Sequence, residues 1–125
     1  MILVDTSVWV HHLQQGDVAL AKLLTDGRVL CHPFVCGELA LGHLKQRELI
    51  LDALQNLPQA QVASAEETLT FISAHTLHGI GIGIGYVDVH LLASTRLTPG
   101  VTLWTLDKRL AAAAERLGVA ANLLH

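Results

Sequence analysis

The sequence has few aromatic side chains, only 4% of its 125 residues, although 51% of the residues are hydrophobic. A core so poor in aromatic rings must be packed by Leu, Val and Ala, as between helices and a sheet. A chain of this length can bury a sizeable core without disulfide or metal staples. Residues 1–125 are therefore predicted to form one globular domain and not a disordered chain.

Long apolar runs and cysteine motifs are also missing. No stretch reaches the roughly 18 residues that a membrane-spanning helix needs. The first residues lack the basic start of a signal peptide, so we expect a cytoplasmic protein without a membrane segment. Cys31 and Cys36 form neither a redox nor a zinc motif, and we expect both to be reduced. The eight histidines are scattered without zinc-binding spacing and are expected on the surface or in packing.

Basic residues are scarce, with eight Lys and Arg against eleven Asp and Glu and a net charge of −3. Binders of nucleic-acid backbones are usually basic, so charge alone argues against such a partner. Four of the acids are nevertheless assigned to one site below. If a divalent metal ion neutralises those four, seven acids face eight bases, which weakens the objection.

Short apolar runs alternate with helical patterns along the chain. Strands are predicted at residues 1–4, 27–32 and 101–106, with extended pieces at 60–63 and 119–124. Helices are predicted at residues 5–13, 17–26, 33–57, 64–79, 86–97 and 107–118. This alternation predicts βαβ units and an α/β fold with a central, mostly parallel sheet covered on both faces.

Several residues mark where these helices begin and end. Thr6, Ser7 and Asp17 are candidate N-caps, and Pro33 suits a first helical turn. Ser64 and Glu67 fit a capping box, and Gly79 is expected to end that helix. The run "GIGIGIG" at 79–85 is interpreted as a flexible loop, because glycine at every second position weakens a strand.

Four carboxylates are predicted to meet at one edge of the sheet. Asp5 and Asp107 lie where predicted strands end, and ligands of open parallel sheets bind at that carboxyl edge. Glu38 and Asp88 lie early in helices that begin at the same edge. Because clustered carboxylates repel one another, such a group needs protonation or a cation. Hard oxygen ligands suit Mg²⁺ or Mn²⁺, which can activate water and stabilise charge on a phosphoryl group.

Each acid also has a purely structural interpretation. Asp5 and Asp107 precede helices and could cap them, while Asp88 in a first turn favours the helix dipole. Glu38 is harder to explain in this way, since it lies among apolar residues of its helix. One shared explanation for all four is a metal site.

Four segments carry a resemblance to a known family when they are taken in order and with their separations. They are "MILVDTSVW", the lone Glu38 in "PFVCGELALG", "GIGYVDVHLLAS" and "LWTLDKRL". From residue 1 to about 118, the chain resembles PIN-domain ribonucleases, in particular the VapC-type toxins of bacterial toxin–antitoxin pairs. No single motif is specific, but four in order are.

The resemblance implies a PIN-like three-layer α/β/α sandwich and a metal-dependent endoribonuclease. Asp5, Glu38, Asp88 and Asp107 match the acidic quartet that binds Mg²⁺ or Mn²⁺. Supporting hydroxyls match at Thr6 or Ser7, beside the first acid, and at Thr105, two residues before the last. Water activated by the metal would cleave RNA to 5′-phosphate and 3′-hydroxyl ends. The glycine stretch before Asp88 is longer than the family pattern needs.

Phosphate contacts and protein partners follow from the same resemblance. Lys108 and Arg109 adjoin the last acid and are the first candidates for RNA phosphates, with Lys45 and Arg47 as weaker ones. Family members usually form homodimers and are inhibited by a small VapB-like antitoxin, a segment of which crosses the active-site groove. The apolar composition is compatible with a partner surface.

Two other kinds of protein remain as alternatives. A receiver-like regulatory domain shares the length, the α/β plan and Mg²⁺, but it needs an acidic pair after the first strand, where Asp5 stands alone. A catalytically silent PIN-like domain that only binds protein or RNA would lack one of the acids, and none is missing.

Overall fold

Three short parallel strands form the centre of the computed structural model, which describes residues 1–123. They are β1 (Ile2–Val4), β2 (Val29–Leu30) and β3 (Thr102–Trp104), in the order β2-β1-β3. Ile2 lies opposite Val29 on one side and opposite Thr102 on the other. Parallel bridges from Cys31 to Gln59 and from Leu103 to Ala120 widen the sheet at both edges. The buried strands explain the continuous apolar runs of the sequence.

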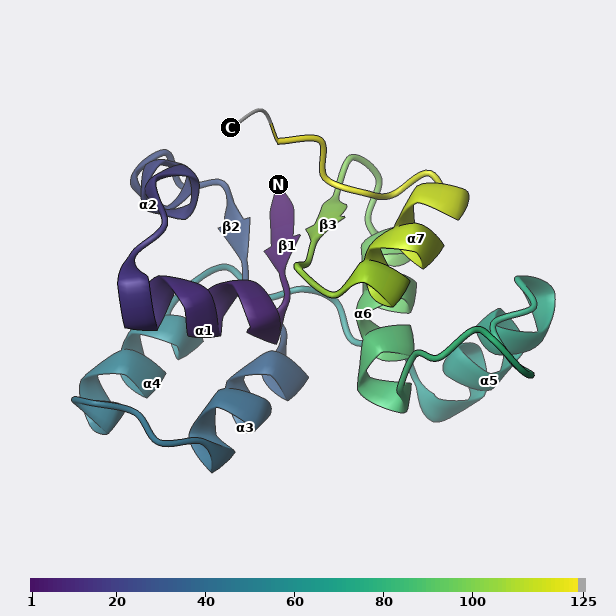
Figure 1. The fold of residues 1–125 in the computed structure, drawn as a ribbon, viewed down its shortest axis with the longest axis horizontal. Coiled ribbons are helices and arrows are strands. Elements are labelled where there is room, and N and C mark those ends of the chain that lie inside the picture. Colours follow the sequence, from purple (N-terminus) through teal and green to yellow (C-terminus); the bar gives the residue numbers. More distant parts are fainter. Residues whose placement is uncertain (124–125) are drawn as a thin grey trace.

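Helices lie on both sides of these strands (Figure 1). Helices α1 to α4 gather beside β2, and α5 to α7 gather beside β3, with the sheet between the two groups. Their bounds are α1 (Thr6–Gln15), α2 (Val18–Thr25), α3 (Pro33–Leu41), α4 (Arg47–Gln55), α5 (Ala65–Ala74), α6 (Tyr86–Leu97) and α7 (Lys108–Arg116). The predicted α/β fold with a parallel central sheet is confirmed.

Aliphatic side chains fill the core, as the shortage of aromatic rings predicts. Leu3 and Leu103 on the strands and Leu91, Leu92 and Leu110 on the helices are almost completely buried. Helix α6 is buried over most of its middle, from Val89 to Thr95, and it packs against β3 and α5. No helix within residues 1–123 combines the length and the apolarity needed to cross a membrane.

Several local sequence signals are confirmed. The Asp17 side chain accepts a hydrogen bond from the Leu20 amide and caps α2. Ser64 and Glu67 form both halves of the capping box of α5. Pro33 occupies the first turn of α3, and residues 79–85 form a loop.

The predicted helix over residues 33–57 is wrong, because the chain turns between two helices there. Helix α3 ends at Leu41 and α4 begins at Arg47, after Gln46 adopts a left-handed conformation with φ of 54°. The Arg47 guanidinium donates to the Ala40 carbonyl at 3.1 Å and so satisfies the end of α3. The apolar period continues across the break because the two helices pack against each other.

Other predicted boundaries also shift. Helix α5 ends at Ala74 and not at Gly79, since the chain turns at Thr76 (φ 52°) and buries Leu77. The N-cap of α1 is Asp5 and not Thr6 or Ser7. The strands predicted at 27–32 and 101–106 are shorter, and the extended contact near 60–63 begins at Gln59. Residue 124 of the last predicted segment lies outside the described residues.

Candidate functional site

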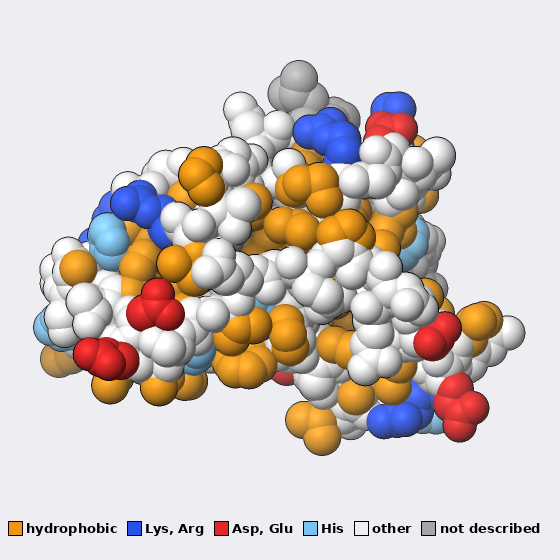
Figure 2. All heavy atoms as spheres, turned by 180° about the vertical axis from the view of Figure 1, so that it is seen from behind, with side chains coloured by type: hydrophobic (Ala, Val, Ile, Leu, Met, Phe, Trp, Pro, Cys, Tyr) orange, Lys and Arg blue, Asp and Glu red, His pale blue; other side chains and the backbone are white. Residues whose placement is uncertain are grey.

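The carboxyl edge of the sheet brings the four predicted acids together. Asp5 follows β1 directly and Asp107 lies three residues after β3, while Glu38 and Asp88 come from α3 and α6. The charges of Asp5, Asp107 and Glu38 all act on the pKa of Asp88. Seen from behind, hydrophobic side chains gather on the surface between the two groups of helices (Figure 2).

Asp5 is the buried member of the group, with only 5% of its surface exposed. Its Oδ2 accepts hydrogen bonds from Ser7 Oγ and Thr105 Oγ1, both at 2.7 Å. Ser7 Oγ also accepts from the Leu106 amide at 3.0 Å. Two hydroxyls that come from opposite ends of the chain therefore hold this carboxylate, which could not be buried without such donors.

Asp107 has a structural task in addition to its place in the group. Its Oδ1 accepts from the amides of Arg109 and Leu110, at 2.9 and 3.0 Å, and so caps α7. The Asp107 amide in turn donates to Thr105 Oγ1 at 3.0 Å. Thr105 thus connects the first acid with the last, and the capping interpretation of Asp107 is correct for one of its two oxygens.

Glu38 and Asp88 are held by neighbours of their own. Thr6 Oγ1 donates to Glu38 Oε1 at 2.7 Å, and the Gly85 amide donates to Asp88 Oδ2 at 3.3 Å. Partial burial raises the pKa of the Asp88 carboxyl above its usual range, and the three neighbouring carboxylates raise it further. The Gly85 amide opposes this rise, since it favours the charged form.

The four carboxylates share one feature. In each, one oxygen accepts a hydrogen bond from the protein, and the other accepts none from the described residues. Carboxylate oxygens are the ligands that Mg²⁺ and Mn²⁺ prefer, so the donor chemistry fits such an ion. Over residues 1–123, however, no three acidic, His or Cys side chains are arranged closely enough to hold one.

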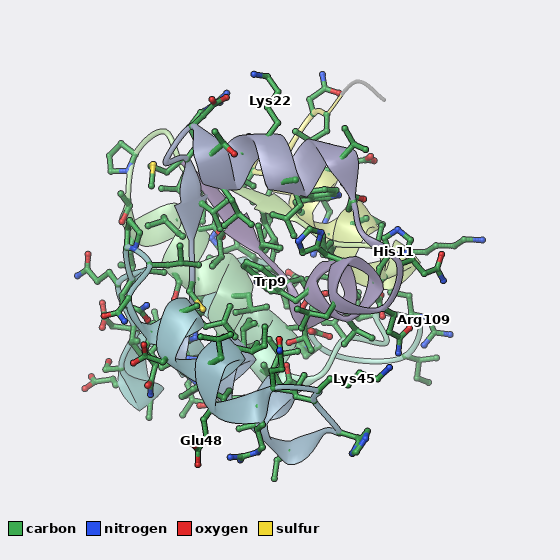
Figure 3. The ribbon with its side chains drawn as sticks, turned by 90° about the vertical axis from the view of Figure 1, so that its left-hand side faces the viewer. Trp9, His11, Lys22, Lys45, Glu48 and Arg109 are labelled. Atoms are coloured by element: carbon green, nitrogen blue, oxygen red, sulfur yellow. The ribbon has the colours of Figure 1, made fainter. Side chains whose placement is uncertain are left out.

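The four basic residues considered for RNA contacts differ in their surroundings. Lys45 and Lys108 are exposed, and Arg47 is engaged by the end of α3. Arg109, in the first turn of α7, projects on the same side of the view as Lys45 (Figure 3). None of the four forms a salt bridge within the described part of the chain.

His32 and His90 are buried in the core, and the sequence did not distinguish them from the other histidines. His32 is completely buried and is the N-cap of α3, where its Nδ1 accepts from the Phe34 amide at 3.0 Å. Its Nε2 lies 3.0 Å from Ser94 Oγ of α6. Since Nδ1 accepts, Nε2 carries the proton and donates to the serine. A neutral imidazole therefore joins the helices that bear Glu38 and Asp88.

Parallel strands that end at acids from four segments define a class of α/β protein whose ligands bind at the carboxyl edge of the sheet. The family model described as "PIN domain" matches residues 2–116. The chain therefore belongs to the PIN domain family, as the resemblance predicted.

Two curated relatives, both named Ribonuclease VapC32, come from Mycobacterium tuberculosis strains CDC 1551 / Oshkosh and ATCC 25618 / H37Rv. Each is 50% identical to this chain over 120 residues, which cover 96% of the chain and 95% of the relative.

Thr105→Val tests the hydroxyl that links Asp5 to Asp107. The variant should lose about 2 kcal/mol of unfolding free energy, because a buried carboxylate loses a short hydrogen bond. The measurement is urea denaturation at pH 7. Thr102→Val in β3 is the matched control, since no hydrogen bond of that side chain is seen in the described residues, and it should change stability by less than about 0.5 kcal/mol. Equal effects of the two variants would contradict the role of Thr105.

His32 should make stability depend on pH. Burial, and then the nearby His90, lower the pKa of His32 from 6.5 to about 4. Between these values the unfolded chain binds a proton and the folded one does not, so stability is full above pH 6.5 and falls towards pH 4. The full effect is roughly 3 kcal/mol. His32→Asn keeps an N-cap acceptor but cannot titrate, so its denaturation midpoints should fall less over this range than those of the parent protein. Parallel pH profiles would contradict this assignment.

Proposed function

We propose that this protein is a metal-dependent endoribonuclease and the toxin component of a bacterial type II toxin–antitoxin module. Asp5, Glu38, Asp88 and Asp107 would together hold Mg²⁺ or Mn²⁺. The observation that carries the proposal is that each carboxylate has one oxygen that accepts a hydrogen bond from the protein and one that accepts none from residues 1–123. Membership of the PIN domain family and the ribonuclease name of both relatives support the same activity.

The chain's own residues would prepare this site in two ways. Thr6, Ser7 and Thr105 hold Glu38 and Asp5 through hydroxyl donors, which would leave the second oxygen of each carboxylate available to a metal ion. Burial, and then the three neighbouring carboxylates, raise the pKa of Asp88, and a divalent ion would offset the repulsion among these charges. When bound, such an ion supplies Lewis acidity towards water and the phosphoryl group, which favours 5′-phosphate and 3′-hydroxyl products.

RNA would lie along the carboxyl edge of the sheet, with its phosphates near basic side chains. Lys45 and Lys108 are exposed and form no salt bridge within residues 1–123, which suits them to this contact. Arg47 would contribute less, because its guanidinium already binds the Ala40 carbonyl. Arg109 adjoins the acids and is the fourth candidate. The cytoplasm, where RNA is translated, is the proposed place of action.

Two protein partners belong to this proposal, a VapB-like antitoxin and a second copy of the chain. Exposed apolar side chains are available for such contacts, among them Leu41 on α3, Leu49 on α4, and Ile80 and Tyr86 near Asp88. Patches of this kind mark protein interfaces. A homodimer would be seen as twice the chain mass in light scattering, and an antitoxin encoded nearby should co-purify and inhibit cleavage.

The first experiment compares the protein with Asp5→Asn, Glu38→Gln, Asp88→Asn and Asp107→Asn on total RNA. Cleavage should need Mg²⁺ or Mn²⁺, stop with EDTA, and fall at least about 100-fold in each variant, because each removes a charge from the same site. Sequencing of the product ends should find 5′-phosphates.

The matched control is Asp26→Asn, an exposed acid that pairs with Lys22 on α2 and should leave cleavage unchanged. Metal-independent cleavage, or variants that cleave as well as the parent, would contradict the quartet. No cleavage by folded protein free of antitoxin would favour the alternative, a binding or regulatory PIN-like domain.

A further inference from the structure

The loop that leads to Asp88 has few anchors of its own. Between α5 and α6 its backbone takes positive φ at Gly79 (95°), Gly81 (89°) and Gly83 (66°). Leu77 is buried at its start and Ile84 packs on the core at its end. Between them, the side chain of Ile80 is fully exposed. Contacts that hold the C-terminal end of this loop therefore affect the position of the start of α6. They also affect the position of Asp88 in its first turn.

Gly83 differs from the other glycines of the loop, because Arg109 of α7 occupies the space beside it. A Cβ atom on Gly83 would lie 2.6 Å from Arg109 Cδ and 2.8 Å from Cζ, and a guanidinium nitrogen would overlap it. At Gly79 and Gly81 such an atom would meet nothing within 4 Å. The Arg109 side chain therefore occupies the space that a side chain at residue 83 would take. We call this contact the Arg109–Gly83 seat.

The seat joins two of the acids through the chain itself. The Arg109 amide donates to Asp107 Oδ1, and two residues after Gly83 the Gly85 amide donates to Asp88 Oδ2. The guanidinium forms no salt bridge with any acid of residues 1–123. The exposed side chain lies in the space beside Gly83 that a Cβ atom would fill, so packing and not charge pairing describes what it does here.

We propose that Arg109 is a positioning residue, whose side chain rests on Gly83 and keeps the glycine loop and Asp88 beside Asp107. The inference rests on the proposed function in one respect, that the four acids form a metal site. The contact explains why residue 83 is glycine, since any larger side chain would displace the Arg109 side chain. It also gives Arg109 a task other than contact with an RNA phosphate.

The test compares Gly83→Ala with the matched control Gly81→Ala. Both alanines are placed at positive φ and carry the same kind of backbone strain, but only the first displaces Arg109. Hydrogen exchange of residues 77–88 should be faster in Gly83→Ala than in Gly81→Ala. Affinity for Mn²⁺, measured by calorimetry, should fall about three- to tenfold in Gly83→Ala only, because outer residues that orient ligands change metal affinity on this scale or above.

Arg109→Ala and the double variant Gly83→Ala/Arg109→Ala complete the design. If both single variants break one seat, the double variant should lose no more Mn²⁺ affinity than either single variant. In cleavage assays kcat should fall while KM for RNA and its salt dependence remain unchanged. A phosphate contact predicts the opposite for Arg109→Ala, a higher KM and a shallower salt dependence, with Gly83→Ala harmless.

Two results would overturn the proposal: equal exchange and Mn²⁺ affinity in Gly83→Ala and Gly81→Ala, or a change confined to KM in Arg109→Ala. Failure of the proposed function looks different, since the parent protein would then neither bind Mn²⁺ nor cleave RNA. In that case hydrogen exchange of the loop still decides whether Arg109 holds it, because this measurement needs neither metal nor RNA. Thermal melts of all variants serve as the control that each is folded.

Discussion

The burial of the Asp5 carboxylate is the constraint on which the rest of the site depends. A carboxylate this well buried is stable only with close donors, and the hydroxyls of Ser7 and Thr105 provide them at 2.7 Å each. Thr105 can reach Asp5 because β3 lies next to β1 in parallel register, with Val4 opposite Trp104. The hydroxyl of the same threonine accepts a hydrogen bond from the Asp107 amide. The strand order of the sheet therefore fixes the spacing of the first and last acids.

The remaining acids add negative charge that the fold tolerates and does not neutralise. Asp88 shows this most directly, because burial and three neighbouring carboxylates raise its pKa. Local donors hold one oxygen of each acid, and this orients the side chains without consuming their capacity to bind a ligand. Such a group costs stability in the absence of a cation. It is the kind of local conflict that folded proteins keep where they have a function.

Helices α3 and α6 bring Glu38 and Asp88 to this edge, and contacts outside the acidic group fix their positions. His32 caps α3 and donates to Ser94 of α6, which joins the two helices through a neutral ring in the core. Near the surface, Arg109 rests on Gly83 ahead of α6. The site is thus supported from below by a buried hydrogen-bonded side chain and at its rim by the exposed side chain of Arg109 beside Gly83.

The sequence by itself determined the class of fold and much of the local structure, and it predicted the four acids as one site. Apolar runs that end at Asp5 and near Asp107, the Ser64–Glu67 capping box and the glycine loop are local patterns, and residues a few positions apart suffice to read them. It did not determine where helices break: the turn at 42–46 was missed because both helices share one apolar period. Only the tertiary structure decided that Ser7 meets Thr105, that His32 meets Ser94 and that Arg109 fills the space at Gly83. Those partners come from distant segments, and crossover connections and packing, which leave no periodic trace in the chain, bring them together.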